Sequence, residues 1–181
     1  MYHDDVSLGS YTPGCYSRLH HLHKRSPCTP DYKELVVGSP NAPVTIIDYS
    51  SLTCPACARF HNATLPELKK NFIDEGIVKL IYRDFPLNSE AAAASMVSRC
   101  GGVDLRYDLL TRLFADQRSW MNGQTGQDVV ENLINIAEEV GLEREQTESC
   151  LGDEQLFKAV LEDYDRGREE DNVRATPTLI I

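Results

Sequence analysis

Two cysteines separated by two residues, Cys54 and Cys57, stand in the segment SLTCPACARFH. The run VTIIDYS before this segment is short, rich in β-branched residues and bounded by turn residues, which predicts a buried strand. The residues after Cys54 have helical character, and Pro55 suits a first helical turn. We therefore expect Cys54 at the amino end of a helix, where unpaired N–H groups and the helix dipole stabilise a thiolate.

A pair of this kind is suited to thiol–disulfide exchange. The thiolate is the nucleophilic form of cysteine, and we expect it at Cys54. Cys57 lies one helical turn further along and points back toward the same helix end. It could close a disulfide with Cys54 after Cys54 has formed a mixed disulfide with a substrate.

The pair has two other interpretations. A zinc site would need a second pair of ligands, and Cys100, Cys150 and His61 each stand alone in the sequence. Two buried thiols without any chemistry are the simpler alternative. The position of the pair between a strand and a helix favours the redox interpretation, so we predict neither a metal nor a cofactor at this site.

Composition narrows the class of protein. The 181 residues carry a net charge of -10, with 41% apolar and 25% charged residues, as expected for a soluble globular domain. The negative charge argues against a nucleic-acid partner, because phosphate contacts need clustered Lys and Arg. No run approaches the roughly 18 to 20 apolar residues that a membrane-spanning helix needs.

The cysteine count bears on the compartment. Six cysteines in a chain of this length suit an oxidising environment better than a reducing cytosol. The first residues lack the basic and then apolar build of a secretory signal. We therefore expect a periplasmic or otherwise exported protein whose signal peptide is absent from this sequence.

The remaining pattern predicts strands at both ends of a helical region. The run VKLIYRDFP is strand-like, so strand, helix and strand form a βαβ unit with parallel strands. From 89 to 171 the pattern is helical, with Gly141 as a plausible helix end, and β character returns at TPTLII. Three apolar stripes predict helix faces that point into the core. Their members are Leu105, Leu109, Leu110, Leu113 and Phe114; Val129, Val130, Leu133, Ala137 and Val140; and Leu156, Phe157, Val160, Leu161 and Tyr164.

The stretch GSPNAPVTIIDYSSLTCPACARFH, the strand VKLIYRDFP, the helical middle and VRATPT together resemble the DsbA family of bacterial thiol–disulfide oxidoreductases. The resemblance covers about residues 32–181. It implies an α/β protein with a thioredoxin-like fold that is interrupted by an all-helical domain. We assign 1–30 to an irregular arm, 31–88 and 151–181 to the thioredoxin-like domain, and 89–150 to the helical insertion.

The resemblance also assigns roles at the site. It implies that Cys54 is the exposed nucleophile and Cys57 the buried resolving thiol. Pro177 matches the cis-proline of the family, and Thr176 before it matches the residue whose backbone meets an extended substrate. Asp48 matches a buried acid beneath the active site, which could exchange the proton of Cys57. The alternative without a catalytic role is that the Asp48 side chain caps a turn or reaches water.

The other four cysteines divide into two pairs. Relatives with a second disulfide carry cysteines in comparable places, so the resemblance implies a structural disulfide between Cys100 and Cys150, with two free buried thiols as the alternative. Cys15 and Cys28 lie outside the resemblance. They could pair or bind a soft metal with nearby histidines, and the sequence leaves their role open.

The resemblance predicts a protein disulfide oxidoreductase that introduces disulfides into exported proteins. Its partners would be unfolded or reduced proteins and a membrane or soluble redox partner that reoxidises the couple. We expect a monomer, since no dimerisation segment is evident. An isomerase or reductase, or a thioredoxin-fold binding or metal-handling protein, is the alternative.

A thioredoxin-type sheet normally continues past the cis-proline strand with a hairpin partner and a closing helix. Here the sequence ends at Ile181, inside the predicted strand. We therefore expect the fold to be incomplete at its carboxyl end and less stable than full-length relatives.

Overall fold

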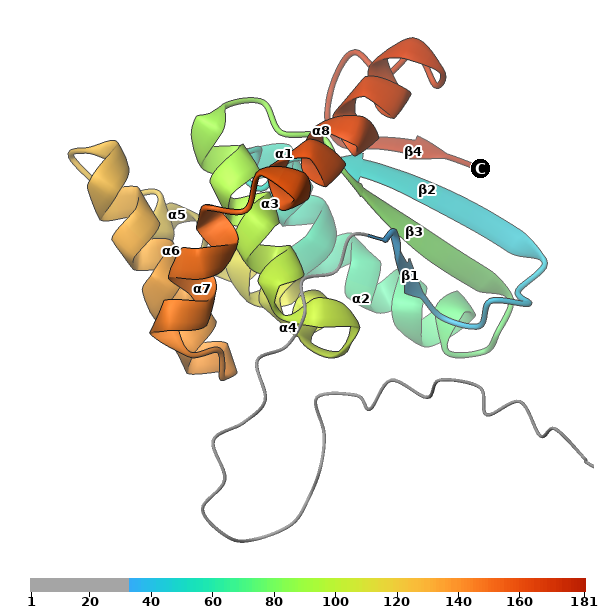
Figure 1. The fold of residues 1–181 in the computed structure, drawn as a ribbon. Coiled ribbons are helices and arrows are strands. Elements are labelled where there is room, and N and C mark those ends of the chain that lie inside the picture. The colour runs from blue at the N-terminus through green and yellow to red at the C-terminus, as the bar shows by residue number, and fades with distance from the viewer. Residues whose placement is uncertain (1–32) are drawn as a thin grey trace, which may run out of the picture.

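The computed structural model describes residues 33–181, which form a four-stranded sheet with helices packed on it and beside it (Figure 1). The spatial order of the strands is β1-β3-β2-β4. The central strands β2 and β3 are parallel, while β1 and β4 run antiparallel to them at the two edges. The strands are β1 (Leu35–Val37), β2 (Val44–Ser50), β3 (Val78–Asp84) and β4 (Thr178–Ile180).

A helical run connects β2 to β3 and confirms the predicted βαβ unit. Two of its segments are π-helical, and the first of these comes just before Pro66. In this wider turn the N–H of Leu65 bonds to the carbonyl of Phe60, five residues back. Proline lacks an N–H and crowds the preceding turn, and a π turn is one way in which a helix accommodates it. The segments are α1 (Pro55–Arg59), η1 (Phe60–Thr64), α2 (Leu65–Leu68) and η2 (Lys69–Ile73).

The second helical region follows β3 and lies beside the sheet (Figure 1). One amphipathic member, α6, begins with a capping box at Thr125 and Asp128 and ends at Gly141, which has a φ of 109°. This confirms Gly141 as the predicted helix end, because glycine adopts such a φ without a steric cost. The helices are α3 (Ser89–Cys100), α4 (Gly102–Ala115), α5 (Gln117–Trp120), α6 (Gly126–Val140), α7 (Arg144–Leu151) and α8 (Glu154–Glu169).

Alternation along β2 separates the two faces of the sheet. Ile46 packs with Phe60 and Leu65 of the first helical run. Tyr49 points to the opposite face, where α8 lies, and packs against Phe85. Gly167 permits the close approach of α8, because a Cβ at this position would lie 2.8 Å from the Tyr49 ring.

The largest apolar cluster runs across the expected domain boundaries. It joins Leu52 and Tyr82 of the sheet region to Leu109 and Leu133 of the helical region. The division at 88 and 151 therefore stays a prediction, since packing between the two parts is continuous.

Two members of one predicted stripe do not face the core. Phe157 and Leu161 of α8 are 43% and 36% exposed, whereas Leu156 and Val160 are buried as expected. The apolar face of α8 is wider than the core surface that this helix covers. The part of the face that stays exposed lines an apolar groove.

A disulfide joins Cys100, the last residue of α3, to Cys150 near the end of α7, with the Cα atoms 5.9 Å apart. The structure thus has the pairing that the resemblance implies. Closing a loop of 50 residues is worth about 4 kcal/mol in the loop-entropy treatment. Cys15 and Cys28 lie outside the described residues.

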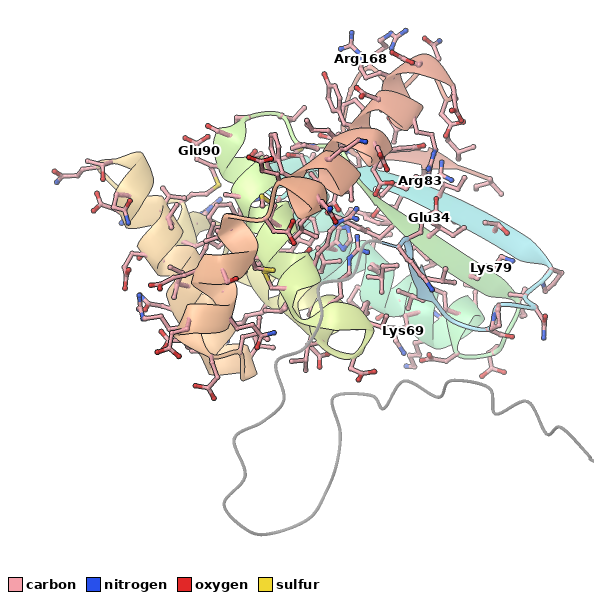
Figure 2. The ribbon with its side chains drawn as sticks, viewed as in Figure 1. Glu34, Lys69, Lys79, Arg83, Glu90 and Arg168 are labelled. Atoms are coloured by element: carbon pink, nitrogen blue, oxygen red, sulfur yellow. A yellow bond between two sulfur atoms is a disulfide. The ribbon has the colours of Figure 1, made fainter. Side chains whose placement is uncertain are left out.

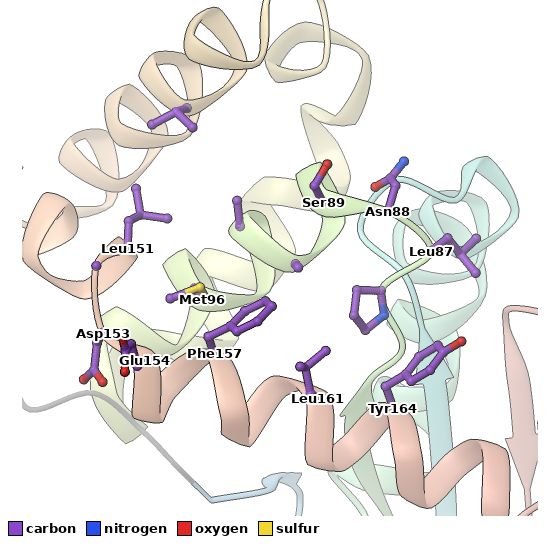
Figure 3. Close-up of a pocket in the computed structure, with 15 residues that line it drawn as sticks. Leu87, Asn88, Ser89, Met96, Leu151, Asp153, Glu154, Phe157, Leu161 and Tyr164 are labelled. Atoms are coloured by element: carbon purple, nitrogen blue, oxygen red, sulfur yellow. The ribbon is translucent and has the colours of Figure 1, made fainter.

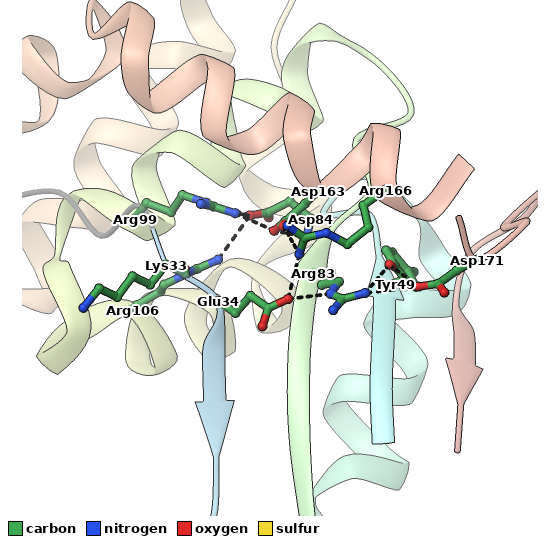
Figure 4. A network of polar contacts seen from close by, with 10 residues as sticks. All are labelled: Lys33, Glu34, Tyr49, Arg83, Asp84, Arg99, Arg106, Asp163, Arg166 and Asp171. Carbon is green, nitrogen blue, oxygen red and sulfur yellow. Dashed lines mark hydrogen bonds and ion pairs between the residues drawn. The ribbon is translucent and has the colours of Figure 1, made fainter. Parts of the chain in front are cut away.

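Buried charges tie the carboxyl end of β3 to three helices (Figure 4). Asp84 lies between Arg99 of α3, at 2.7 Å, and Arg106 of α4, at 3.2 Å. Arg99 also bonds Asp163 of α8 at 2.7 Å. Burial raises the pKa of Asp84, but the two arginines outweigh burial and hold the pKa below its ordinary value.

A second, more exposed set of polar contacts continues from this network. Glu34 bonds Arg83 of β3 at 2.7 Å and Arg166 of α8 at 2.8 Å, and the first two side chains lie together over the sheet (Figure 2). Arg83 in turn bonds the hydroxyl of Tyr49, which donates to Asp171 at 2.5 Å. The two sets connect β1, β2, β3 and α8 around the end of β3. Within residues 33–181, no helix has the length and apolar character needed to cross a membrane.

We predict that Arg99→Met lowers the free energy of unfolding by about 3–5 kcal/mol, because Asp84 and Asp163 would lose their shared cation inside the core. Arg112→Met is the matched control. Arg112 is 47% exposed and pairs with Asp116 and Glu139, so its loss should cost about 0–1 kcal/mol. Urea unfolding measures both, and equal losses would contradict this account of the network.

Candidate active site

Cys54 lies at the junction of β2 and α1. Its backbone is extended, with φ -83° and ψ 119°, and Pro55 begins the helix. A tight turn leads into it, since the N–H of Cys54 bonds to the carbonyl of Ser51 at 3.1 Å. Gln117 of α5 fixes this turn, because its side-chain amide donates to the carbonyls of Leu52 and Cys54 at 2.8 and 3.0 Å.

The loop before β4 covers the Cys54 sulfur. The Thr176–Pro177 peptide bond is cis, and the Cys54 thiol lies 3.4 Å from the carbonyl oxygen of Thr176. The Thr176 hydroxyl is also buried and has no nitrogen or oxygen partner in the part of the chain that the structure describes. Pairing of β4 with β2, in the register of Thr178 with Tyr49, brings this loop over the cysteine.

Cys57 lies deeper than Cys54. It is fully buried, while Cys54 is 8% exposed, so the expected order of exposure holds. The expectation that Cys54 is an exposed thiol is wrong for this structure, because the Thr176 loop packs over it. The N–H of Ser51 donates to the Cys57 sulfur at 3.5 Å.

The pKa values of the two thiols are shifted in opposite directions. Burial disfavours the Cys54 thiolate, but polar groups of Thr176, Cys57 and Ala56 favour it more strongly, so the pKa of Cys54 lies below its ordinary value. Burial raises the pKa of Cys57 to about 11, and the bond that its thiol makes to the Cys54 sulfur adds to this. One sulfur is therefore disposed to ionise and the other to stay protonated.

Asp48 is fully buried on β2. Its carboxylate accepts a hydrogen bond from the Ser50 hydroxyl at 2.6 Å and lies 2.8 Å from the Nε2 atom of His61. The side chain thus makes specific buried contacts and neither caps a turn nor reaches water.

His61 belongs to the site, although its sequence position alone did not indicate this. Its ring stacks on Phe114 of α4, with centroids 3.9 Å apart and 13° between the planes. Cys57 and His61 are four residues apart on one helical run, a spacing that places both on the same face. That spacing is the signal that could have linked His61 to the cysteines.

An apolar groove of about 660 Å³ opens between α3, α7 and α8 (Figure 3). Phe157, Leu161 and Met96 line it. Its rim reaches the residues next to the cysteines, since Asn88 accepts a hydrogen bond from the Thr53 hydroxyl at 3.3 Å. In residues 33–181 no cluster of three or more His, Cys, Asp or Glu could hold a metal ion.

A family model described as thioredoxin matches residues 31–181 of this chain. The chain belongs to the thioredoxin family. Its fold is the thioredoxin-like α/β fold with additional helices that the sequence predicted. The match includes the cysteine pair, Asp48 and the cis-proline loop in a single unit.

Relatives place this thioredoxin-family chain among DsbA-like proteins. It is 26% identical over 133 residues to a putative protein-disulfide oxidoreductase of Rickettsia bellii, covering 72% of this chain and 50% of the relative. It is 27% identical over 154 residues to disulfide bond formation protein D of Bacillus subtilis, covering 81% and 66%. The crystal structure of Wolbachia pipientis alpha-DsbA1 superposes with a TM-score of 0.74 at 27% identity, covering 81% of this chain and 73% of that one.

The chain spans about half the length of the rickettsial relatives it matches. Its family and fold follow from these likenesses. The activity, substrates and partners of the protein are taken up below as proposals.

We predict that Thr176→Val raises the pKa of Cys54 toward its ordinary value, because the Thr176 side chain is the foremost group that favours the thiolate against burial. At pH 7 less of Cys54 would be ionised, so its alkylation by iodoacetamide should slow several-fold. The matched control is Thr178→Val, on the same segment, whose hydroxyl bonds the carbonyl of Ala175 instead. An unchanged rate in Thr176→Val would contradict the assigned role of this side chain.

Proposed function

We propose that this protein is a thiol–disulfide oxidoreductase that introduces disulfides into other proteins through the Cys54–Cys57 couple. The observation that carries the proposal is the contrast between the two sulfurs, a lowered pKa at Cys54 and a pKa of about 11 at Cys57. Stabilisation of the Cys54 thiolate favours the reduced form of the couple. A couple whose reduced form is stabilised donates its disulfide readily.

The roles of the two cysteines follow from this contrast. In the oxidised protein a substrate thiolate attacks the Cys54 sulfur, the Cys54–Cys57 bond breaks, and Cys57 leaves with the electron pair. A second substrate thiol then attacks the mixed disulfide, so that the substrate gains a disulfide and Cys54 departs as the stabilised thiolate. Asp48 serves as the buried acid that exchanges the proton of Cys57.

Thr176 and Pro177 supply the substrate contact in this proposal. The carbonyl of Thr176 already lies beside the Cys54 sulfur. An extended segment that carries the reacting cysteine would align with this loop through backbone hydrogen bonds. Substrates are therefore unfolded or reduced proteins, whose backbone is free to pair.

Export and reoxidation complete the proposal. The disulfide between Cys100 and Cys150 is of the kind that persists in oxidising compartments, which supports a periplasmic or otherwise exported location. Each turnover leaves Cys54 and Cys57 reduced, so a membrane or soluble partner must accept two electrons from them. The protein acts as a monomer in this scheme.

Cysteine variants test the proposal. Cys54→Ser should abolish oxidative refolding of a reduced substrate protein, because the nucleophile is lost. A protein with Cys57→Ser, activated as a mixed disulfide at Cys54, should form an adduct with a substrate that has a single cysteine, and this adduct should persist because neither Cys57 nor a second substrate thiol is present to attack it. Mass spectrometry of acid-quenched samples locates the adduct. Full refolding activity in Cys54→Ser would exclude the proposal.

The residues between the cysteines should set the strength of the oxidant. Pro55 and Ala56 bring no charge and no side-chain donor, whereas many DsbA-like proteins have His at the second position. Ala56→His should stabilise the thiolate and make the couple more oxidising by about 30 mV or more, equivalent to about 1.4 kcal/mol. Equilibration with glutathione measures this, with the exposed position variant Arg59→His as control. A more oxidising wild type would contradict the prediction.

A further inference from the structure

The proposed mechanism does not yet say how the proton that Asp48 exchanges with Cys57 reaches these buried groups from solvent. When Cys57 leaves as a thiolate it is fully buried, and its pKa of about 11 means that it takes up a proton at neutral pH. A thiol of high pKa is also a poor leaving group unless it is protonated as the bond breaks. The proton must therefore reach a sulfur that has no direct access to water.

Three side chains form a continuous polar line from this sulfur. The chain beside Ser50 reaches Cys57, since the N–H of Ser51 donates to its sulfur at 3.5 Å, and the Ser50 hydroxyl is a further hydrogen-bonding group that lowers the pKa of the Cys57 thiol. The Ser50 hydroxyl also donates to Asp48 at 2.6 Å, and the second carboxylate oxygen of Asp48 meets Nε2 of His61 at 2.8 Å. Ser50 is 1% exposed and Asp48 fully buried, while the His61 side chain retains 7% exposure. Exposure thus returns at the far end of the line.

Apart from Asp48, the side chains around the His61 ring are aromatic. Phe114 from α4 stacks on its ring, and Phe60 and Tyr82 contact the ring edge-on at centroid distances of 5.3 and 5.7 Å. The titratable groups that contact it are Asp48 from β2 and Tyr82 from β3, while α4 contributes the uncharged Phe114. His61 is also the only histidine in the sequence from 33 to 181.

We propose that His61 is the outer station of a proton route that runs from solvent through His61, Asp48 and Ser50 to Cys57. His61 is a positioning residue in this scheme: it orients the Asp48 carboxylate and renews the proton on it. The inference rests on the proposed redox function and deepens it.

The step balances in protons and electrons. A substrate thiolate forms a bond to the Cys54 sulfur, the bond between Cys54 and Cys57 breaks, and the electron pair stays on Cys57. The His61 imidazolium gives a proton to the Asp48 carboxylate, and Asp48 passes one proton on through the Ser50 hydroxyl to Cys57. Asp48 ends as the carboxylate from which it started, and His61 regains a proton from water. The reverse step removes the Cys57 proton by the same groups.

The test is the single-turnover reduction of the oxidised protein by dithiothreitol at pH 7, followed by acid quench and mass spectrometry. His61→Gln keeps an amide donor for Asp48 but cannot carry a proton. We expect it to react about tenfold or more slowly than wild type, a smaller loss than the roughly 10²–10⁴-fold of a directly acting acid–base group, because His61 acts through Asp48. His61→Ala should be slow as well, and added imidazole should restore most of its rate. Rescue by imidazole is a response that loss of packing alone does not produce.

Asn62→Ala is the matched structural control, since Asn62 lies next to His61 and bonds the carbonyl of the same Phe114 at 3.0 Å. Dithiothreitol should reduce this variant at the wild-type rate, and added imidazole should not change that rate. A His61→Gln rate within twofold of wild type would overturn the proton route, as would imidazole that leaves His61→Ala unchanged. If His61→Ala does not fold, the rate of His61→Gln decides. A wild-type protein whose disulfide does not react with thiols would instead contradict the proposed function.

Discussion

The contact between the loop at Thr176 and the first turn of α1 is the constraint on which the rest of the site depends. It places polar groups of Thr176 beside the Cys54 sulfur while Cys57, three residues further on, is enclosed by the core. Two chemically identical side chains thereby acquire different acidities. This difference gives the exchange reaction a direction, because the sulfur that ionises readily is the better leaving group from a mixed disulfide, whereas the other sulfur takes up a proton as it leaves.

The contact is made by segments far apart in the sequence, so much of the fold serves to position it. Antiparallel pairing of β4 with β2 places Thr178 opposite Tyr49 and so determines where Thr176 lies. The Arg99 and Asp84 network fixes the end of β3, and the N–H of Phe85 just after it bonds the carbonyl of Ser50. The turn that carries Cys54 is thus held from the sheet below and by Gln117 from the helical layer above.

Local features of this fold were predictable from sequence because they have local causes. The β-branched run before the cysteines, the proline after Cys54 and the glycine at 141 each act within one strand or one helix end. The resemblance added the disulfide between Cys100 and Cys150, which connects helices that no periodicity would pair. The cis bond at Pro177 came from the same source.

What the sequence did not predict depends on tertiary packing. His61 stands alone in the sequence, because its partners Asp48 and Phe114 lie on other elements. Gln117 gave no signal, since a glutamine is ordinary on a helix. Phe157 and Leu161 fit a core-facing stripe, but periodicity gives the direction of a face and not the width of the surface that covers it. The burial of Cys54 likewise depends on a loop 122 residues away.

The most direct test of this account is an NMR titration of the reduced protein with ¹³Cβ-labelled cysteine, which follows the two sulfurs separately. The account predicts two distinct ionisations, with the pKa of Cys54 below the ordinary value of a free cysteine and that of Cys57 at about 11. Two sulfurs that titrate together at the ordinary value would contradict it.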